Sequence, residues 1–174
     1  KKNSERLVYN LSTILFIILL ALVLNLFSIE EKMIFNESYK IDPLSSFMKS
    51  LIIVSAVFVM ISSFPYLKSL NILKIEYPIL ILSSVLGMMI MISSNDLIVF
   101  YLGLELQSLA LYVLAAFNRD NVLSSESGLK YFVLSALSSG LLLYGCSLIY
   151  GFSGSTNFTY IANTSSSIEY GVIF

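Results

Sequence analysis

The sequence contains no histidine and no tryptophan, and it has only one cysteine, Cys146, in 174 residues. A single cysteine forms no disulfide within the chain, and without histidine the usual cysteine and histidine zinc sites are excluded. Charged residues are only 12% of the chain, about half of their share in typical soluble domains. The net charge is −1, and no cluster of Lys or Arg indicates nucleic-acid binding. These absences argue against metal-site, disulfide-framework and nucleic-acid functions.

Hydrophobic residues, in contrast, make up 57% of the chain, and the mean hydropathy is +0.86. A helix that spans a membrane needs about 20 mostly apolar residues. The sequence therefore predicts an all-α, polytopic transmembrane helix bundle that forms a single domain over residues 1–174. We expect the second span to end before Pro65, and a polar Gly/Ser/Thr/Asn segment to follow the fifth span as a loop. The predicted spans are residues 7–28, 44–64, 75–92, 96–117 and 124–152, with a further helix beginning near residue 170.

The distribution of Lys and Arg predicts the orientation of these spans. Loops that remain in the cytoplasm or matrix carry an excess of positive charge. Basic residues are more frequent on the N-terminal side, which we therefore expect to face the matrix or cytoplasm. The residue usage is typical of AT-rich genomes, such as many organellar ones, and favours the mitochondrial inner membrane over a bacterial plasma membrane. The basic residues of the N-terminal side are Lys1, Lys2, Arg6, Lys68, Lys74 and Arg119, with Lys130 close by; those opposite are Lys32, Lys40 and Lys49.

The most informative charged residue is Glu105, which lies within the apolar stretch "YLGLELQSLALYVLAAFNRD" of residues 101–120. This carboxylate is about 14 Å from one end of its predicted helix and nearly 20 Å from the other, so it cannot easily reach the membrane surface. A carboxylate in hydrocarbon costs several kcal/mol unless it is paired, hydrated or protonated. Burial favours the neutral form of such a group and a nearby cation favours the charged form, so it can exchange a proton near neutral pH.

Three polar side chains share the helix face of Glu105. Tyr101, Ser108 and Tyr112 fall within about 60° of it at 100° per residue. Such a stripe faces protein or water rather than lipid, and it favours a role for Glu105 in proton handling. The alternative is a buried carboxylate that only holds two helices together.

Residues of the following helix are the next candidates. Lys130 lies near the helix start, where its side chain can extend to the membrane surface. The axial gap between Glu105 and Lys130 is about 10 to 15 Å, so we expect no direct salt bridge between them. Ser135 and Ser139 form a small-residue patch, and this spacing predicts close helix packing. Asp96 suits the N-terminus of the helix that carries Glu105.

Two long segments carry a resemblance to a known family. The segments "NDLIVFYLGLELQSLALYVLAAF" and "SSESGLKYFVLSALSSGLLLYGCSLIYGFSGSTNF" resemble the subunit 2 family of proton-pumping NADH:ubiquinone oxidoreductase, respiratory complex I. Its members are antiporter-like bundles of about fourteen spans with two inverted five-helix repeats and broken helices. The resemblance implies that the spans at 75–92, 96–117 and 124–152 begin the first repeat. It also implies that Glu105 is a proton-channel carboxylate and Lys130 a second functional residue.

The same resemblance implies a function and partners. The chain would be the N-terminal part of a membrane-arm subunit that couples quinone reduction to proton pumping. NADH, FMN, iron–sulfur clusters and ubiquinone would bind elsewhere in the complex, and no redox cofactor is expected in this chain. The lysine that couples to Glu105 would lie beyond Phe174. We therefore expect a fragment or split-gene product, completed by another segment and surrounded by other membrane-arm subunits and lipids. The alternatives are a cation/proton antiporter subunit and a structural scaffold without proton transfer.

Overall fold

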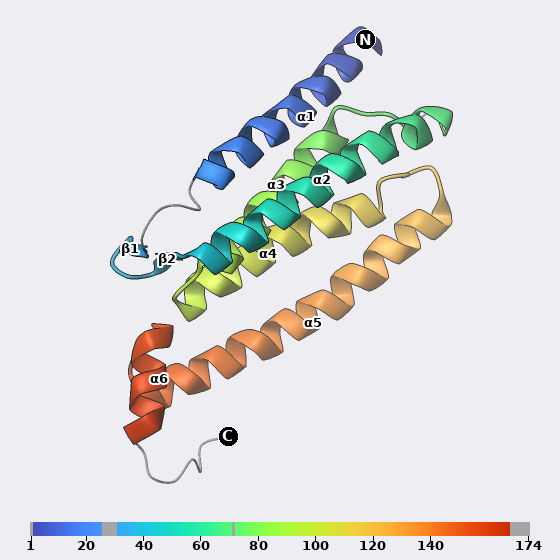
Figure 1. Cartoon of the computed structure of the whole chain (residues 1–174). Helices are drawn as coiled ribbons and strands as arrows, with labels where there is room; N and C mark the ends of the chain where they lie inside the picture. Colours follow the sequence, from blue (N-terminus) through green and yellow to red (C-terminus); the bar gives the residue numbers. More distant parts are fainter. Residues whose placement is uncertain (1, 26–30, 71, 168–174) are drawn as a thin grey trace.

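The computed structural model describes residues 2–25, 31–70 and 72–167 of the chain. Within these ranges the protein is almost entirely helical, with a short antiparallel β-hairpin between the first two helices (Figure 1). Five helices, α1 to α5, are long and apolar enough to cross a membrane. The elements in chain order are α1 (Lys2–Asn25), β1 (Lys32–Ile34), β2 (Tyr39–Ile41), α2 (Pro43–Ser69), α3 (Glu76–Ser93), α4 (Leu97–Ala115), α5 (Val122–Ser153) and α6 (Phe158–Ser167).

The five predicted spans correspond to α1 to α5, which confirms the all-α transmembrane bundle. The predicted end of the second span was wrong, because α2 continues through Pro65 to Ser69. A proline inside a membrane helix is tolerated where neighbouring side chains supply hydrogen bonds near the break. Here the Tyr9 hydroxyl of α1 donates to the Met60 carbonyl at 2.9 Å and also contacts the Ser63 hydroxyl, five and two residues before Pro65.

The segment after α5 was also predicted wrongly. Residues of the polar stretch form α6 rather than a loop. The Asn157 side chain accepts hydrogen bonds from the Thr159 and Tyr160 amides, at 2.9 and 3.3 Å, and so caps the start of this helix. The composition suggested a loop because it is rich in residues that also act as helix caps. The helix expected near residue 170 lies outside the described residues.

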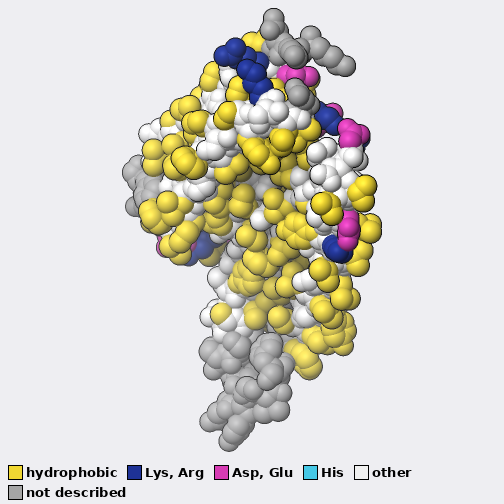
Figure 2. Space-filling model, turned by 90° about the vertical axis from the view of Figure 1, so that its right-hand side faces the viewer, with side chains coloured by type: hydrophobic (Ala, Val, Ile, Leu, Met, Phe, Trp, Pro, Cys, Tyr) yellow, Lys and Arg dark blue, Asp and Glu magenta, His cyan; other side chains and the backbone are white. Residues whose placement is uncertain are grey.

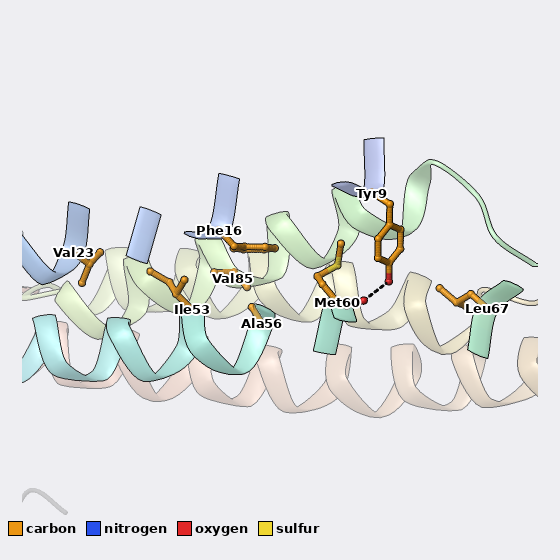
Figure 3. Close-up of a cluster of buried hydrophobic side chains, with 8 residues drawn as sticks. All are labelled: Tyr9, Phe16, Val23, Ile53, Ala56, Met60, Leu67 and Val85. Atoms are coloured by element: carbon orange, nitrogen blue, oxygen red, sulfur yellow. Dashed lines mark hydrogen bonds between the residues drawn. The ribbon is translucent and has the colours of Figure 1, made fainter. Parts of the chain in front are cut away.

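Helices α1 and α2 pack through residues that recur every seven positions. Tyr9, Phe16 and Val23 on α1 are all buried, and Ile53, Met60 and Leu67 on α2 are buried opposite them. Figure 3 shows these side chains directed into one seam, with Val85 of α3 and Ala56 in the same cluster. A seven-residue spacing keeps one helix face towards its partner and is typical of left-handed helix pairs. This seam attaches the N-terminal helix to the bundle.

Helices α3 and α4 approach each other much more closely, at two glycines. A Cβ atom on Gly87 would lie 2.6 Å from the Gln107 backbone nitrogen and 2.7 Å from the Gly103 carbonyl oxygen. A Cβ on Gly103 would lie 2.9 Å from the Gly87 carbonyl oxygen. Real Cβ atoms do not occupy such positions, so both sites require glycine. This backbone contact fixes α4, the helix that carries Glu105, against α3.

Side-chain caps define where the spans begin. The Asp42 carboxylate accepts a hydrogen bond from the Ser45 amide at 2.7 Å, and the Ser45 hydroxyl accepts one from the Asp42 amide, so that α2 begins with a reciprocal capping box. Burial raises the pKa of Asp42, but the hydrogen bonds from Ser45 and the nearby Lys40 ammonium outweigh it, and the net pKa lies below its usual value. Asp96 caps α4 by accepting from the Ile98 amide at 2.8 Å, as the sequence predicts.

Three connecting segments meet at the same end of the bundle. The Glu37 carbonyl of the β-hairpin accepts from the Asn95 side chain at 2.9 Å and from the Asn157 side chain at 3.3 Å. The Asp96 carboxylate accepts from the Thr156 hydroxyl at 2.5 Å. The hairpin, the α3–α4 turn and the α5–α6 connection are therefore joined at the end opposite the N-terminus (Figure 1). This network holds the start of α4 close to the end of α5.

A buried lysine lies near this end of the bundle. The Lys49 side chain of α2 is only 6% exposed, and its ammonium group donates to the Tyr39 hydroxyl at 3.0 Å. No salt bridge of Lys49 occurs among the residues that the structure describes. Because a charged group is costly to bury without hydrogen bonds, the Tyr39 hydroxyl is an important partner.

We expect Tyr39→Phe to lower the free energy of unfolding by about 1 to 3 kcal/mol, because it leaves the Lys49 ammonium group without this acceptor. Tyr66→Phe is the matched control, since Tyr66 lies on α2, the helix that carries Lys49, and is 65% exposed. Thermal unfolding of the membrane-embedded protein measures both variants. Equal stability of the two variants would show that the hydrogen bond to Lys49 makes no net contribution to the free energy of unfolding.

Candidate functional site

Helices α4 and α5 form an antiparallel pair whose register places Glu105. The structure packs Gly128 of α5 directly against Ala116 at the end of α4, where a Cβ on Gly128 would lie 2.5 Å from the Ala116 Cβ. From this contact, Glu105 lies eleven residues back along α4 and Ser139 lies eleven residues forward along α5. Because the two helices rise equally per residue, these side chains meet at the same depth, about 16 Å from the contact.

The contacts of Glu105 confirm this register. The Ser139 hydroxyl donates a hydrogen bond to Glu105 Oε1 across the helix pair. The Tyr101 hydroxyl, one turn before Glu105, lies 3.0 Å from the same serine oxygen. Tyr101, Ser139 and Glu105 therefore form a continuous chain of hydrogen bonds. In this part of the structure the carboxylate has no ion-pair partner.

The other two residues of the predicted stripe have different surroundings. The Ser108 hydroxyl donates to the backbone carbonyl of Glu105 at 3.0 Å and not to its carboxylate. The Tyr112 ring is buried and packs edge-to-face against Tyr131 and Phe132 of α5, with centroid distances of 5.0 and 5.6 Å. The stripe thus faces α5, which agrees with the prediction that it faces protein or water rather than lipid, but only Tyr101 connects to the partner of the carboxylate.

A small cavity lies between α4 and α5 beside this chain of hydrogen bonds. Its volume is about 120 Å³, which is enough to hold water. Five of its seven lining residues carry a hydroxyl group, and hydroxyl groups can orient water molecules and pass protons between them. The cavity extends the polar surroundings of the Ser139 and Glu105 pair along the helix interface. Its lining residues are Leu104, Ser108, Tyr112, Ser135, Ser138, Ser139 and Leu142.

Lys130 does not join this cluster. Its ammonium group forms a salt bridge with Glu126 at 2.6 Å, one turn earlier on α5, and the two side chains are 70% and 49% exposed. The ion pairs between described residues do not include Glu105 with Lys130, as the sequence predicts. An exposed pair of this kind contributes about 0 to 1 kcal/mol to stability. The functional role of Lys130 stays a prediction.

The serines of α5 do more than allow helices to approach. The sequence predicts a packing role for Ser135 and Ser139, and both lie at the α4–α5 interface. However, Ser139 acts as a hydrogen-bond donor to Glu105, a role that the sequence analysis missed. The available signal was that Ser139 follows Gly128 by eleven residues, just as Glu105 precedes Ala116 by eleven. These spacings become informative only once the contact of Gly128 with Ala116 is known.

We expect Ser139→Ala to slow proton transfer through Glu105 about tenfold, because a hydrogen bond to a charged group contributes about 1.5 to 3 kcal/mol. Ser138→Ala is the matched control, since Ser138 lines the same cavity but no hydrogen bond links it to Glu105. Initial rates of NADH-driven proton uptake by vesicles that contain the reconstituted complex measure the effect. The same rate in both variants would contradict a role for the Ser139 hydroxyl.

Comparison with known proteins agrees with this geometry. A family profile described as "NADH:quinone oxidoreductase/Mrp antiporter, TM" matches residues 94–173, which include Glu105, Lys130 and Ser139. NADH-quinone oxidoreductase subunit N of Pelagibacter ubique is 62% identical over the whole chain. The chain is thus similar, over its whole length, to part of a subunit N of NADH-quinone oxidoreductase. Subunit N is the homologue of subunit 2, to which the sequence resemblance points.

Other relatives of this family extend the comparison. Subunit N of Maricaulis maris is 60% identical over 76% of the chain and 28% of its own length. A solved structure of respiratory complex I from Thermus thermophilus with bound aureothin matches 98% of the chain, with a TM-score of 0.79 and 25% identity, over 35% of its own chain. The chain spans only 37% of the length of the subunit N from Pelagibacter ubique. The fold of the antiporter-like family is thus confirmed for the described helices.

Proposed function

We propose that this chain is part of a proton-translocating antiporter-like subunit of NADH-quinone oxidoreductase, and that Glu105 carries the proton. The observation that carries the proposal is the position of this carboxylate. It lies near the middle of α4, is hydrogen-bonded to Ser139 across the helix pair, and is next to a cavity lined by hydroxyl groups. A membrane-embedded carboxylate with polar surroundings is typical of proton pathways.

In the proposed mechanism, the Glu105 carboxyl group takes up and releases a proton at mid-membrane. The Ser139 hydroxyl stabilises its charged form by a hydrogen bond, the Tyr101 hydroxyl is hydrogen-bonded to Ser139 in turn, and water in the adjacent cavity exchanges protons with the carboxyl group. A change of charge elsewhere in the membrane arm would alter the pairing of Glu105 with a lysine beyond Phe174, and the proton affinity would change with the pairing. Lys130 would act near the start of α5, where its side chain is 70% exposed and forms an ion pair with Glu126.

The complete subunit would act as one component of a multisubunit enzyme. NADH oxidation and quinone reduction would occur on other subunits, with NADH, FMN, iron–sulfur clusters and ubiquinone bound there. The partners would be the remaining helices of the antiporter-like fold and the neighbouring membrane-arm subunits. The named relatives come from bacteria, which supports a bacterial plasma membrane over the mitochondrial inner membrane that residue usage favours. The N-terminal side of the bundle would then face the cytoplasm.

The test uses a bacterium whose own subunit N gene is deleted and replaced by the full-length gene that contains this sequence. We expect its membrane vesicles to oxidise NADH and to build a pH gradient that a protonophore abolishes. Vesicles from the deletion strain are the control. A complex that oxidises NADH at the normal rate without building the gradient would contradict the proposal and support a structural scaffold.

A cation/proton antiporter is the second candidate, because the description of the matching profile also includes the Mrp antiporters. Such a protein would dissipate a pH gradient when Na⁺ is added, without any NADH. The same vesicles distinguish the two functions, since we expect no Na⁺-dependent change in the absence of NADH.

A further inference from the structure

A pocket lies at the end of the bundle that carries the N-terminus, between the start of α3 and the end of α4. Its volume is about 270 Å³, and it has a polar rim and an apolar interior. The rim carries two cations and one carboxylate, whereas aliphatic and aromatic side chains line the interior. The rim residues are Lys74, Glu76 and Arg119, and the interior residues are Ile79, Leu80, Val113, Ala116 and Phe117.

The two cations of this rim are available to a ligand. Lys74 and Arg119 are exposed, and neither takes part in a salt bridge between described residues. The Lys74 ammonium group lies 5.9 Å from the centroid of the Phe117 ring, which holds it over the mouth of the pocket. Glu76 lies in the first turn of α3 and offsets part of the positive charge. The rim therefore has an excess of one positive charge.

The depth of the pocket matches the boundary between lipid headgroups and hydrocarbon. Helix α3 begins at Glu76 and α4 ends at Ala115, so the rim lies where both spans leave the membrane. Ile79 and Val113, one turn further in, extend the apolar lining towards the membrane interior. Figure 2 shows the side of the molecule that carries these connections, where small groups of Lys and Arg lie among a mostly hydrophobic surface.

We propose that this pocket binds an anionic phospholipid of the surrounding membrane. Lys74 and Arg119 bind the headgroup phosphate, and one acyl chain lies against Ile79, Leu80 and Val113. Paired cations above an apolar groove complement a phosphate attached to a hydrocarbon chain, whereas free phosphate would leave the apolar lining without a partner. This site lies at the end of α4, at least eight residues beyond Glu105 along the helix, and is independent of the proton-transfer proposal.

The experiment uses the assembled complex in bilayers of phosphatidylcholine that contain a trace of photoactivatable lipid. The probe is phosphatidylglycerol with a diazirine on one acyl chain, and phosphatidylcholine with the same acyl chain is the reference. Mass spectrometry measures the labelling of residues 74–80 and 113–119. We expect the anionic probe to label them about fivefold more than the neutral probe, which corresponds to one net cation near the surface.

Variants then assign the effect to the rim. We expect the ratio of the two probes to fall below one in Lys74→Ala/Arg119→Ala, because only the Glu76 carboxylate then remains on the rim, and to rise in Glu76→Gln, since each nearby charge contributes about fivefold. Lys68→Ala is the matched control, because Lys68 is exposed at the same end of the bundle but does not line the pocket. A ratio of one in the unchanged protein, a ratio that survives the double substitution, or an equal fall in Lys68→Ala would overturn the proposal.

Discussion

Glu105→Gln is expected to stop proton transfer through this subunit while leaving the helix bundle intact. Glutamine has almost the same shape and still accepts a hydrogen bond from Ser139, but it cannot take up a proton. A positioned acid or base contributes about 10²- to 10⁴-fold to a proton transfer, so we expect the rate through this site to fall at least about 100-fold. NADH-driven acidification of reconstituted vesicles measures the change.

Two further variants control this experiment. Glu105→Asp retains a carboxyl group and should keep part of the activity, because only its distance from Ser139 changes. Glu5→Gln removes a carboxylate from the first turn of α1, away from α4 and α5, and should leave proton transfer unchanged. Full coupled activity in Glu105→Gln would exclude an essential charge at this position and would favour the interpretation that the carboxylate only holds α4 against α5.

Gly103→Ala is expected to destabilise the bundle strongly. The added Cβ would lie 2.9 Å from the Gly87 carbonyl oxygen and 2.9 Å from the Met91 backbone nitrogen. Neither atom belongs to a side chain that could rotate away, so α3 and α4 would have to separate along their contact. Forced overpacking typically costs about 1 to 3 kcal/mol, and we expect at least the upper value here because backbone must move.

Gly140→Ala is the matched control for the glycine contact. A Cβ on Gly140 would meet no described atom within 4 Å apart from its chain neighbours and the backbone of its own helix. Because alanine favours a helix over glycine by about 1 kcal/mol, this substitution should be neutral or slightly stabilising. Thermal unfolding and the amount of subunit retained in the membrane measure both variants. Similar behaviour of Gly103→Ala and Gly140→Ala would show that α3 and α4 do not need their backbone contact.

The sequence predicts the spans well because hydrophobic length is a local property. It identifies all five membrane helices and the Asp96 cap, for which the required residues are consecutive. It fails at Pro65, where the continuation of α2 coincides with contacts from Tyr9 on another helix. The helix α6 was missed for a related reason, since cap residues such as Asn157 occur in both loops and helix starts.

In the candidate site, too, local features can be predicted from the sequence, whereas contacts between helices cannot. The depth of Glu105 and the polar face of its helix follow from the spacing of residues along α4. The partner, Ser139, depends on how far α5 is shifted along α4, and the connection between the helices does not reveal that shift. Gly128 and Gly103 mark the contacts that fix the helix positions, but a glycine in a membrane helix indicates a close approach only when the opposite helix is known.

The central claim is that the Glu105 carboxyl group changes protonation during turnover while hydrogen-bonded to Ser139. Infrared difference spectroscopy of the complex, before and after NADH addition, observes carboxyl groups directly. The account predicts a carboxyl C=O band that appears with turnover, is absent from Glu105→Gln, and shifts in Ser139→Ala because the hydrogen bond is lost. A turnover spectrum whose carboxyl bands are identical in the unchanged protein, Glu105→Gln and Ser139→Ala would contradict it.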